Sequence, residues 1–135
     1  MKVILISLPA PFEEEPAMNP PLGLCYILSY LKSKSIDAEI LDFTLFKNYD
    51  YYKNDYLKEI PLDADFYGIF STSALFYWLH EVSKYLKENS DGLIVAGGPH
   101  PSTMPKQTLE DTDVDFVVKG DGEIPMYLFA TGHNP

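Results

Sequence analysis

Two apolar runs in the sequence end in glycines, and polar residues follow each of them. Residues 93–98 run from apolar side chains into two glycines, after which His100 stands between two prolines. Residues 114–118 are followed by a Lys-Gly-Asp-Gly-Glu stretch at residues 119–123. Glycine has no Cβ, so a ligand can approach the backbone closely at such positions. These segments indicate either tight turns before helices or a place where a large molecule lies against the chain.

A third apolar run, residues 66–71, ends in Ser71 and continues into Thr72, Ser73 and Ala74. Small side chains leave space beside a strand end, and hydroxyl groups can donate and accept hydrogen bonds. Any one of the three turns is more often a plain turn. Three of them at one edge of a sheet would make a ligand groove as good an explanation as plain turns.

The periodicity of apolar residues predicts the elements that must position these turns. Short apolar runs, typical of strands covered on both faces, occupy residues 2–8, 37–43, 66–71, 93–96 and 114–118. Helical spacing and helix-start signals place helices at residues 21–33, 46–60, 74–89, 105–111 and 124–129. Strands that alternate with helices form a parallel sheet. Residues 1–135 therefore predict one α/β domain in three layers, with a doubly wound, five-stranded parallel sheet.

A common strand order for such sheets is 2-1-3-4-5, and ligands bind outside the carboxyl ends of the strands. In this order one edge gathers the loops that begin at Pro9, Ser71, Gly97 and Gly120. No G-x-G-x-x-G follows the first strand, which argues against a dinucleotide-binding domain. The third strand ends in serine where a phosphate-accepting receiver domain needs aspartate, which argues against that class.

Composition excludes further classes. The chain has 20 acidic residues, 10 lysines and no arginine, for a net charge of −10, which opposes binding to nucleic acid and to anionic membranes. Cys25 is the single cysteine, so the chain can form neither an internal disulfide nor a site of several thiolates. No apolar run approaches the roughly 18 residues of a membrane span, and we recognise no signal peptide, so we expect a cytoplasmic protein.

Several of these segments together resemble the N-terminal cobalamin-binding domain of the B12-binding radical SAM proteins. The residues that carry the resemblance are Pro20 to Leu24 with Tyr26, Leu28 and Leu31, then Asp42, Gly97 to Ser102, and Val114 to Glu123. The last stretch is similar to the family's D-x-V-V-x-G-E-G-E element, with Asp121 in place of the first glutamate. The resemblance covers the chain from the first strand to the last helix.

The resemblance implies a flavodoxin-like fold whose corrinoid cofactor lies over the carboxyl edge of the sheet. The nucleotide tail would enter a groove beside the third and fourth strands, where side chains at residues 97 and 98 would fill the space. The implied cofactor-binding residues are Leu22, Gly23, Ser71, Thr72, Ser73, Leu75, Gly97, Gly98, Pro99, His100, Gly120, Gly122 and Glu123. Residues 73–75 also look like the S-x-L of other B12-binding domains.

The sequence departs from related domains at two points. The D-x-H-x-x-G motif, whose histidine ligates cobalt in the methionine-synthase type of domain, is absent, and residues 9–23 contain no histidine. The C-x-x-x-C-x-x-C triad of a radical SAM domain is also absent. We therefore expect a truncated or excised domain that binds cobalamin without that ligand, with the [4Fe–4S] cluster and S-adenosylmethionine confined to a further domain.

Two functions remain open from the sequence. The first is a cobalamin-binding module of a radical SAM enzyme of the methyltransferase or cyclase type, not catalytic alone. The second is an interaction or structural domain that keeps the fold and binds no cofactor. His100 has three open roles: a residue beside the corrin, a cobalt ligand, or a structural residue. The helix at residues 21–33 is apolar nearly all round, which predicts contact with a radical SAM domain, a partner chain or a second copy of this chain.

Overall fold

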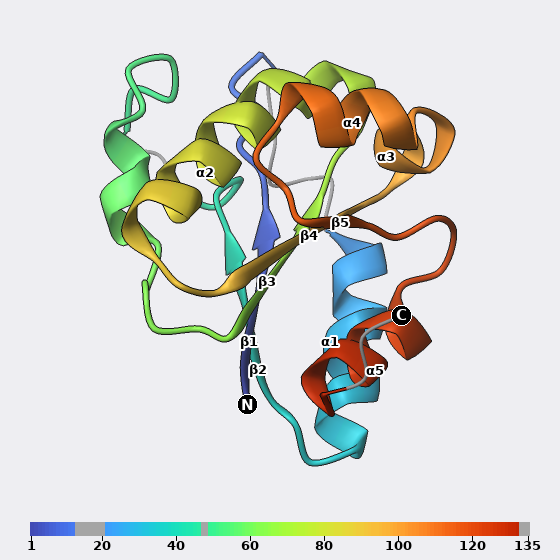
Figure 1. Cartoon of the computed structure of the whole chain (residues 1–135). Helices are drawn as coiled ribbons and strands as arrows, with labels where there is room; N and C mark the ends of the chain where they lie inside the picture. The colour runs from blue at the N-terminus through green and yellow to red at the C-terminus, as the bar shows by residue number, and fades with distance from the viewer. Residues whose placement is uncertain (13–20, 47–48, 133–135) are drawn as a thin grey trace.

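Five parallel strands form the centre of the protein (Figure 1). The computed structural model describes residues 1–12, 21–46 and 49–132. The strands are β1 (Lys2–Ser7), β2 (Asp37–Asp42), β3 (Phe66–Phe70), β4 (Leu93–Gly97) and β5 (Phe116–Val117). Their order is β2-β1-β3-β4-β5, and every neighbouring pair is parallel. The predicted flavodoxin-like topology is therefore confirmed.

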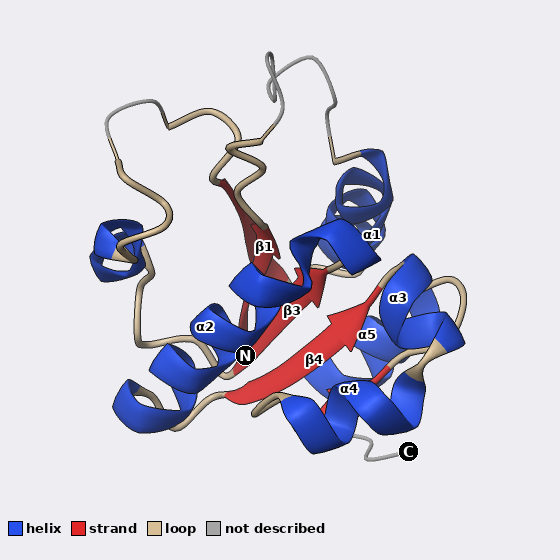
Figure 2. Cartoon of the chain, turned by 90° about the horizontal axis from the view of Figure 1, so that it is seen from above, coloured by secondary structure: helices blue, strands red, loops and turns tan. Residues whose placement is uncertain are grey.

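Helices cover both faces of the sheet (Figure 2). On one face lie α1 (Leu22–Ser33) and α5 (Glu123–Ala130), whose buried side chains pack against Val3, Leu5 and Val95 of the strands. On the other face lies α2 (Phe76–Asn89), which packs against Ile4, Ile69 and Ile94 among others. This arrangement gives the three predicted layers, with one apolar core on each side of the sheet. No helix in the described ranges is long and apolar enough to cross a membrane.

Alternation along β3 decides which side chains reach each core. Tyr67 and Ile69 belong to the α2 side, whereas Phe66 and Phe70 belong to the α1 and α5 side. Successive strand residues point to opposite faces, so Gly68 also faces α1 and α5. The face that carries α1 and α5 therefore has a position without a side chain in the middle of the sheet.

The helix predicted at residues 46–60 is wrong. The described part of this segment consists of turns and a 3-10 helix, η2 (Asp55–Glu59). The Asp50 carboxylate accepts a hydrogen bond of 3.1 Å from the Tyr52 amide, which favours a turn over a helix. Asn54 adopts a left-handed conformation with φ of 58°. Of the three tyrosines at helical spacing, Tyr49, Tyr52 and Tyr56, only Tyr56 is fully buried in the core below α2, and Tyr52 is 60% exposed, so their spacing does not mark one buried helix face.

The connections near the carboxyl edge also differ in detail from the prediction. A 3-10 turn, η3 (Ser73–Leu75), precedes α2, and the proline-rich loop after β4 forms the short helix α3 (Pro99–Thr103) before α4 (Pro105–Asp111). Strand β5 is shorter than residues 114–118, because the Asp115 carboxylate takes the place of a ladder carbonyl and accepts a hydrogen bond of 2.8 Å from the Ile94 amide. The predicted long loop at residues 9–21 lies mostly outside the described residues.

Candidate cofactor site

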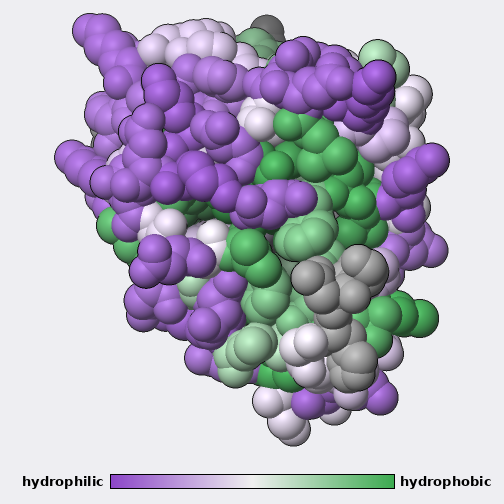
Figure 3. All heavy atoms as spheres, in the orientation of Figure 1, coloured by the Kyte–Doolittle hydropathy of each residue, from purple (hydrophilic) through white to green (hydrophobic). Residues whose placement is uncertain are grey.

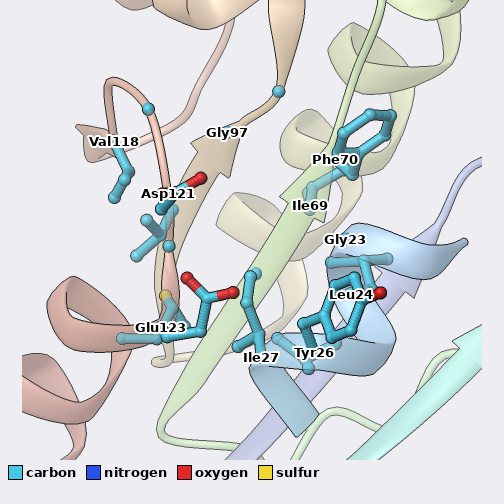
Figure 4. A pocket seen from close by; sticks show the side chains of 17 residues that line it. Gly23, Leu24, Tyr26, Ile27, Ile69, Phe70, Gly97, Val118, Asp121 and Glu123 are labelled. Carbon is cyan, nitrogen blue, oxygen red and sulfur yellow. The ribbon is translucent and has the colours of Figure 1, made fainter. Parts of the chain in front are cut away.

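A cavity of about 200 Å³ lies on the sheet face between α1, α5 and the ends of β3 and β4 (Figure 4). We call it the sheet-face cavity. Its lining residues are Leu5, Gly23, Leu24, Tyr26, Ile27, Gly68, Ile69, Phe70, Val95, Gly97, Gly98, Val118, Gly120, Asp121, Gly122, Glu123 and Met126. Most of these residues are apolar or glycine, so the cavity suits an apolar, flat group better than a charged one.

Gly97 keeps this cavity open. Among the atoms of the described residues, a Cβ added at Gly97 would have only the Val118 carbonyl oxygen within 4 Å, at 3.9 Å. A larger side chain would therefore extend into the cavity. Gly68 lies deeper on the same face, and its missing Cβ lets Leu5 and Met126 approach, because the added atom would lie 2.8 Å from Leu5 Cδ2.

Gly98 has a different role from the one predicted. Its φ of +104° and ψ of −177° belong to a region that only glycine adopts readily. A Cβ there would lie 2.7 Å from the Ser71 carbonyl oxygen and 3.0 Å from Phe70 Cδ2, not in open space. The backbone itself thus requires this glycine, and only Gly97 of the pair keeps space free for a ligand.

A second cavity, of about 400 Å³, opens at the carboxyl ends of β1 and β3. We call it the edge cavity, and it lies where the strand order reverses. It is lined by Ser7, Leu8, Ala10, Phe12, Pro21, Leu22, Gly23, Leu24, Thr44, Phe70, Thr72, Ala74 and Leu75. Gly23, Leu24 and Phe70 line both cavities. The two spaces therefore adjoin at the start of α1 and the end of β3.

The linings of the two cavities contain few polar groups among the described residues, and each of these groups is either uncharged or acidic. Ser7, Thr44 and Thr72 carry the hydroxyls of the edge cavity, and Asp121 and Glu123 carry the carboxylates of the sheet-face cavity. Figure 4 shows the Asp121 and Glu123 carboxylates on the side of the cavity opposite Phe70. Among the lining residues of the described chain there is no lysine or histidine. Neutral and donor-rich ligands are therefore favoured over anions.

Hydrogen bonds fix the turns that carry these groups. Asp42 Oδ1 accepts from the Thr44 amide at 3.0 Å and from the Thr44 hydroxyl at 2.6 Å, which sets Thr44 at the edge cavity. The Gly120 amide donates to Ser102 Oγ at 3.2 Å, which ties the glycine-rich turn after β5 to α3. Glycine at position 120 is suited to its φ of +81°.

The structure gathers nine of the thirteen predicted site residues into these linings. Leu22, Gly23, Thr72 and Leu75 line the edge cavity, and Gly23, Gly97, Gly98, Gly120, Gly122 and Glu123 line the sheet-face cavity. Ser71, Ser73, Pro99 and His100 lie beside the cavities and line neither of them. Ser71 is buried, and its amide donates to the Gly97 carbonyl at 2.9 Å, so it joins the ends of β3 and β4.

Sequence reasoning missed Tyr26, Ile27, Gly68 and Phe70 as lining residues. The signal for Phe70 was present in the strand alternation, because Phe70 shares a face with Phe66 and Gly68. Within the described ranges, no group of three or more histidine, cysteine, aspartate or glutamate side chains could hold a metal ion.

The mouth of the site lies in apolar surroundings. Leu22 is 59% exposed and Tyr26 is 64% exposed, although each lines a cavity. Figure 3 shows apolar residues gathered in the middle of the face that carries β5 and α5, with hydrophilic surface to the left and above. The first helix is thus buried along Leu24 and Leu31 and leaves apolar side chains at the rim of the site.

Comparisons with known proteins agree with this fold. Two structures of the radical S-adenosylmethionine methyltransferase TsrM from Kitasatospora setae are similar to the chain. One contains the tryptophan substrate and a SAM analogue (21% identity, TM-score 0.76), and the other contains cobalamin and a [4Fe–4S] cluster (21% identity, TM-score 0.77). The alignments cover 99% of this chain but only 27% and 26% of TsrM. No curated protein sequence matches the chain.

The sequence model of the family described as "B12 binding domain" matches residues 16–130, which is most of the chain. This match confirms cobalamin as the cofactor class that the sequence indicated. The five-stranded parallel order agrees with the structural likeness to TsrM. The chain belongs to the B12-binding domain family.

Proposed function

We propose that this domain holds cobalamin with the corrin ring over the edge cavity and the nucleotide tail in the sheet-face cavity. The observation that carries the proposal is the space beside Gly97, which adjoins a second cavity at the end of β3. One ligand with a broad part and a narrow part can occupy two adjoining spaces of this kind. A domain that only kept the fold would have no need of Gly97, because nothing in its own packing requires a glycine there.

The lining fits the chemistry of cobalamin. The base of the nucleotide tail is a flat aromatic group, and Leu24, Ile27 and Val118 offer apolar walls for it. The corrin ring carries neutral amides whose N–H groups donate hydrogen bonds. The hydroxyls of Thr44 and Thr72, which line the edge cavity, can accept them.

The domain would bind the corrinoid without a histidine from a D-x-H-x-x-G motif. Residues 9–23 hold no histidine, and His100 has partners on both ring nitrogens. When bound, cobalamin would supply a cobalt centre suited to methyl transfer. The chain's own residues would orient the corrin, exclude water from the tail and leave the exposed corrin face to a partner.

We also propose that this partner is a radical SAM domain, which would hold the [4Fe–4S] cluster and S-adenosylmethionine. Support comes from the share of TsrM that the chain spans and from the exposed Leu22 and Tyr26 at the rim of the site. A second copy of the chain is an alternative occupant of that rim, and light scattering over a range of concentrations distinguishes the two. A cytoplasmic location stays a prediction.

The test is uptake of hydroxocobalamin by the purified 135-residue chain. The protein is incubated with excess cofactor and passed over a gel-filtration column with detection at 280 nm and in the visible range. We expect the visible bands to elute with the protein at a fixed stoichiometry. A colourless protein peak at every cofactor concentration would refute the proposal and favour an interaction domain without cofactor.

A further inference from the structure

Phe70 stands between the two cavities. It is the last residue of β3, and its side chain lines both the sheet-face cavity and the edge cavity. Of the three residues that line both, Gly23 has no side chain and Leu24 is buried in the core. Within the described ranges, Phe70 is therefore the only shared lining residue whose side chain is both large and incompletely buried.

The ring closes the space between α1 and the end of β4. A Cβ at Gly23 would lie 3.9 Å from Phe70 Cε2, and a Cβ at Gly98 would lie 3.0 Å from Phe70 Cδ2. One edge of the ring thus faces two glycines on two different elements. Figure 4 shows the Phe70 side chain projecting from the end of β3, above Gly23 and Leu24 of α1. The ring lies against backbone on this edge and separates the cavity below it from the cavity at the sheet edge.

We propose that Phe70 is a gate that selects corrinoids by their nucleotide tail. This inference rests on the proposed function, because it concerns a ligand that spans both cavities. Such a ligand must pass the place that the ring occupies, so the ring has to turn away before the tail enters. A corrinoid without a tail needs only the edge cavity and does not move the ring.

The closed ring therefore lowers the affinity and association rate of only one class of ligand, the corrinoids with a nucleotide tail. When only a fraction of molecules has the gate open, the apparent affinity and the association rate fall by that fraction. If the ring is turned away in about one molecule in ten, removing it raises both quantities about tenfold for a tailed corrinoid. The same removal raises neither quantity for a corrinoid without a tail, because that ligand does not need the ring to move; loss of the Phe70 contact in the edge cavity can only lower them.

The experiment compares aquacobalamin with diaquacobinamide, which is the same corrinoid without the nucleotide. Association rates and equilibrium affinities are measured by visible absorbance for the unmodified chain, Phe70→Ala and Phe70→Leu. Phe46→Ala is the matched control, because Phe46 is an exposed phenylalanine outside both linings. Circular dichroism and urea unfolding verify that each variant is folded, and Phe70→Leu keeps an apolar side chain if the alanine variant is too unstable.

We expect Phe70→Ala to bind aquacobalamin about tenfold faster and more tightly, while its association rate and affinity for diaquacobinamide do not rise. Equal shifts for both corrinoids, no shift for either, or weaker binding of aquacobalamin would each overturn the gate and leave the proposed function intact. If the unmodified chain and all variants bind neither corrinoid, the proposed function falls and the gate falls with it.

Discussion

His100 Nδ1 lies 2.9 Å from Ser73 Oγ, a contact that joins the turn after β3 to the helix after β4. On the other side of the ring, Nε2 lies 2.7 Å from Gln107 Oε1 of α4. The amide oxygen of glutamine can only accept, so Nε2 carries the proton and Nδ1 accepts from the Ser73 hydroxyl. Neither nitrogen has a free lone pair for cobalt, and this geometry favours the structural role among the three that the sequence left open.

The His100→Ala variant tests this role. It removes two side-chain hydrogen bonds that hold η3 and α4 together, so we expect the free energy of unfolding to fall by about 1–2 kcal/mol. Urea unfolding measures this loss. We also expect the visible spectrum of bound cobalamin to stay unchanged, because no protein nitrogen is lost from cobalt.

His80→Ala is the matched control for the histidine substitution. His80 lies on α2 and its nearest charged partner is Glu81, with Nδ1 3.5 Å from Oε1. We expect this variant to differ from the unmodified chain by less than about 0.5 kcal/mol. A visible band that shifts in His100→Ala but not in His80→Ala would assign His100 to the cobalt and contradict the structural role.

The space beside Gly97 gives a second prediction. Gly97→Val places three carbons in the sheet-face cavity, while the new Cβ itself meets only the Val118 carbonyl at 3.9 Å. Valine also suits a strand. We therefore expect a stability close to that of the unmodified chain and a cobalamin affinity at least about tenfold weaker, which is about 1.4 kcal/mol of binding free energy. Titration followed by visible absorbance measures it, and undiminished affinity would place the nucleotide tail elsewhere.

In contrast to Gly97→Val, Gly98→Ala should lower the stability of the protein more than its affinity for cobalamin. Alanine at a φ of +104° is strained, and its Cβ would lie 2.7 Å from the Ser71 carbonyl oxygen. We expect a loss of about 1–3 kcal/mol in the free energy of unfolding. Cobalamin affinity of the molecules that remain folded should change less than in Gly97→Val. A variant as stable as the unmodified chain would show that the backbone at residue 98 relaxes without cost.

Gly97 and Gly98 illustrate which features of the site can be predicted from the sequence and which cannot. Their pairing after an apolar run correctly predicted a strand end beside a cavity, because neighbouring parallel strands end at the same edge. Their separate roles depend on φ and on the approach of the Ser71 carbonyl, and neither quantity follows from residue types. Sequence alone therefore assigned one role to both residues.

The segment around η2 marks a second limit. The helical spacing of Tyr49, Tyr52 and Tyr56 did not predict the backbone conformation. The turn at Asp50, the left-handed conformation of Asn54 and the packing of the segment against β2 and α2 determine it. Tertiary packing outweighs weak helix propensity in such a segment. The apolar strands, in contrast, were predictable because burial on both faces leaves a continuous apolar run.

Tyr51 in this segment gives the last prediction. Its single hydroxyl proton is shared between the Phe43 and Phe46 carbonyl oxygens, which lie 3.0 and 2.6 Å from the hydroxyl oxygen. Burial raises the pKa of Tyr51 from 10.0 to about 12. The folded protein therefore favours the neutral phenol. This contribution to stability is fully present below about pH 10 and is lost as the pH rises toward about 12.

Urea unfolding between about pH 8 and pH 11 should therefore show stability falling at the alkaline end, and Tyr51→Phe should reduce that fall. At pH 8, Tyr51→Phe should lose about 1 kcal/mol, because the two carbonyls lose their donor. Tyr56→Phe is the matched control, since the buried Tyr56 hydroxyl has no hydrogen-bond partner within the described chain. Its removal should be neutral or stabilising at pH 8. Equal losses in the two variants would mean that the Tyr51 hydrogen bonds contribute nothing to the packing of this segment against β2.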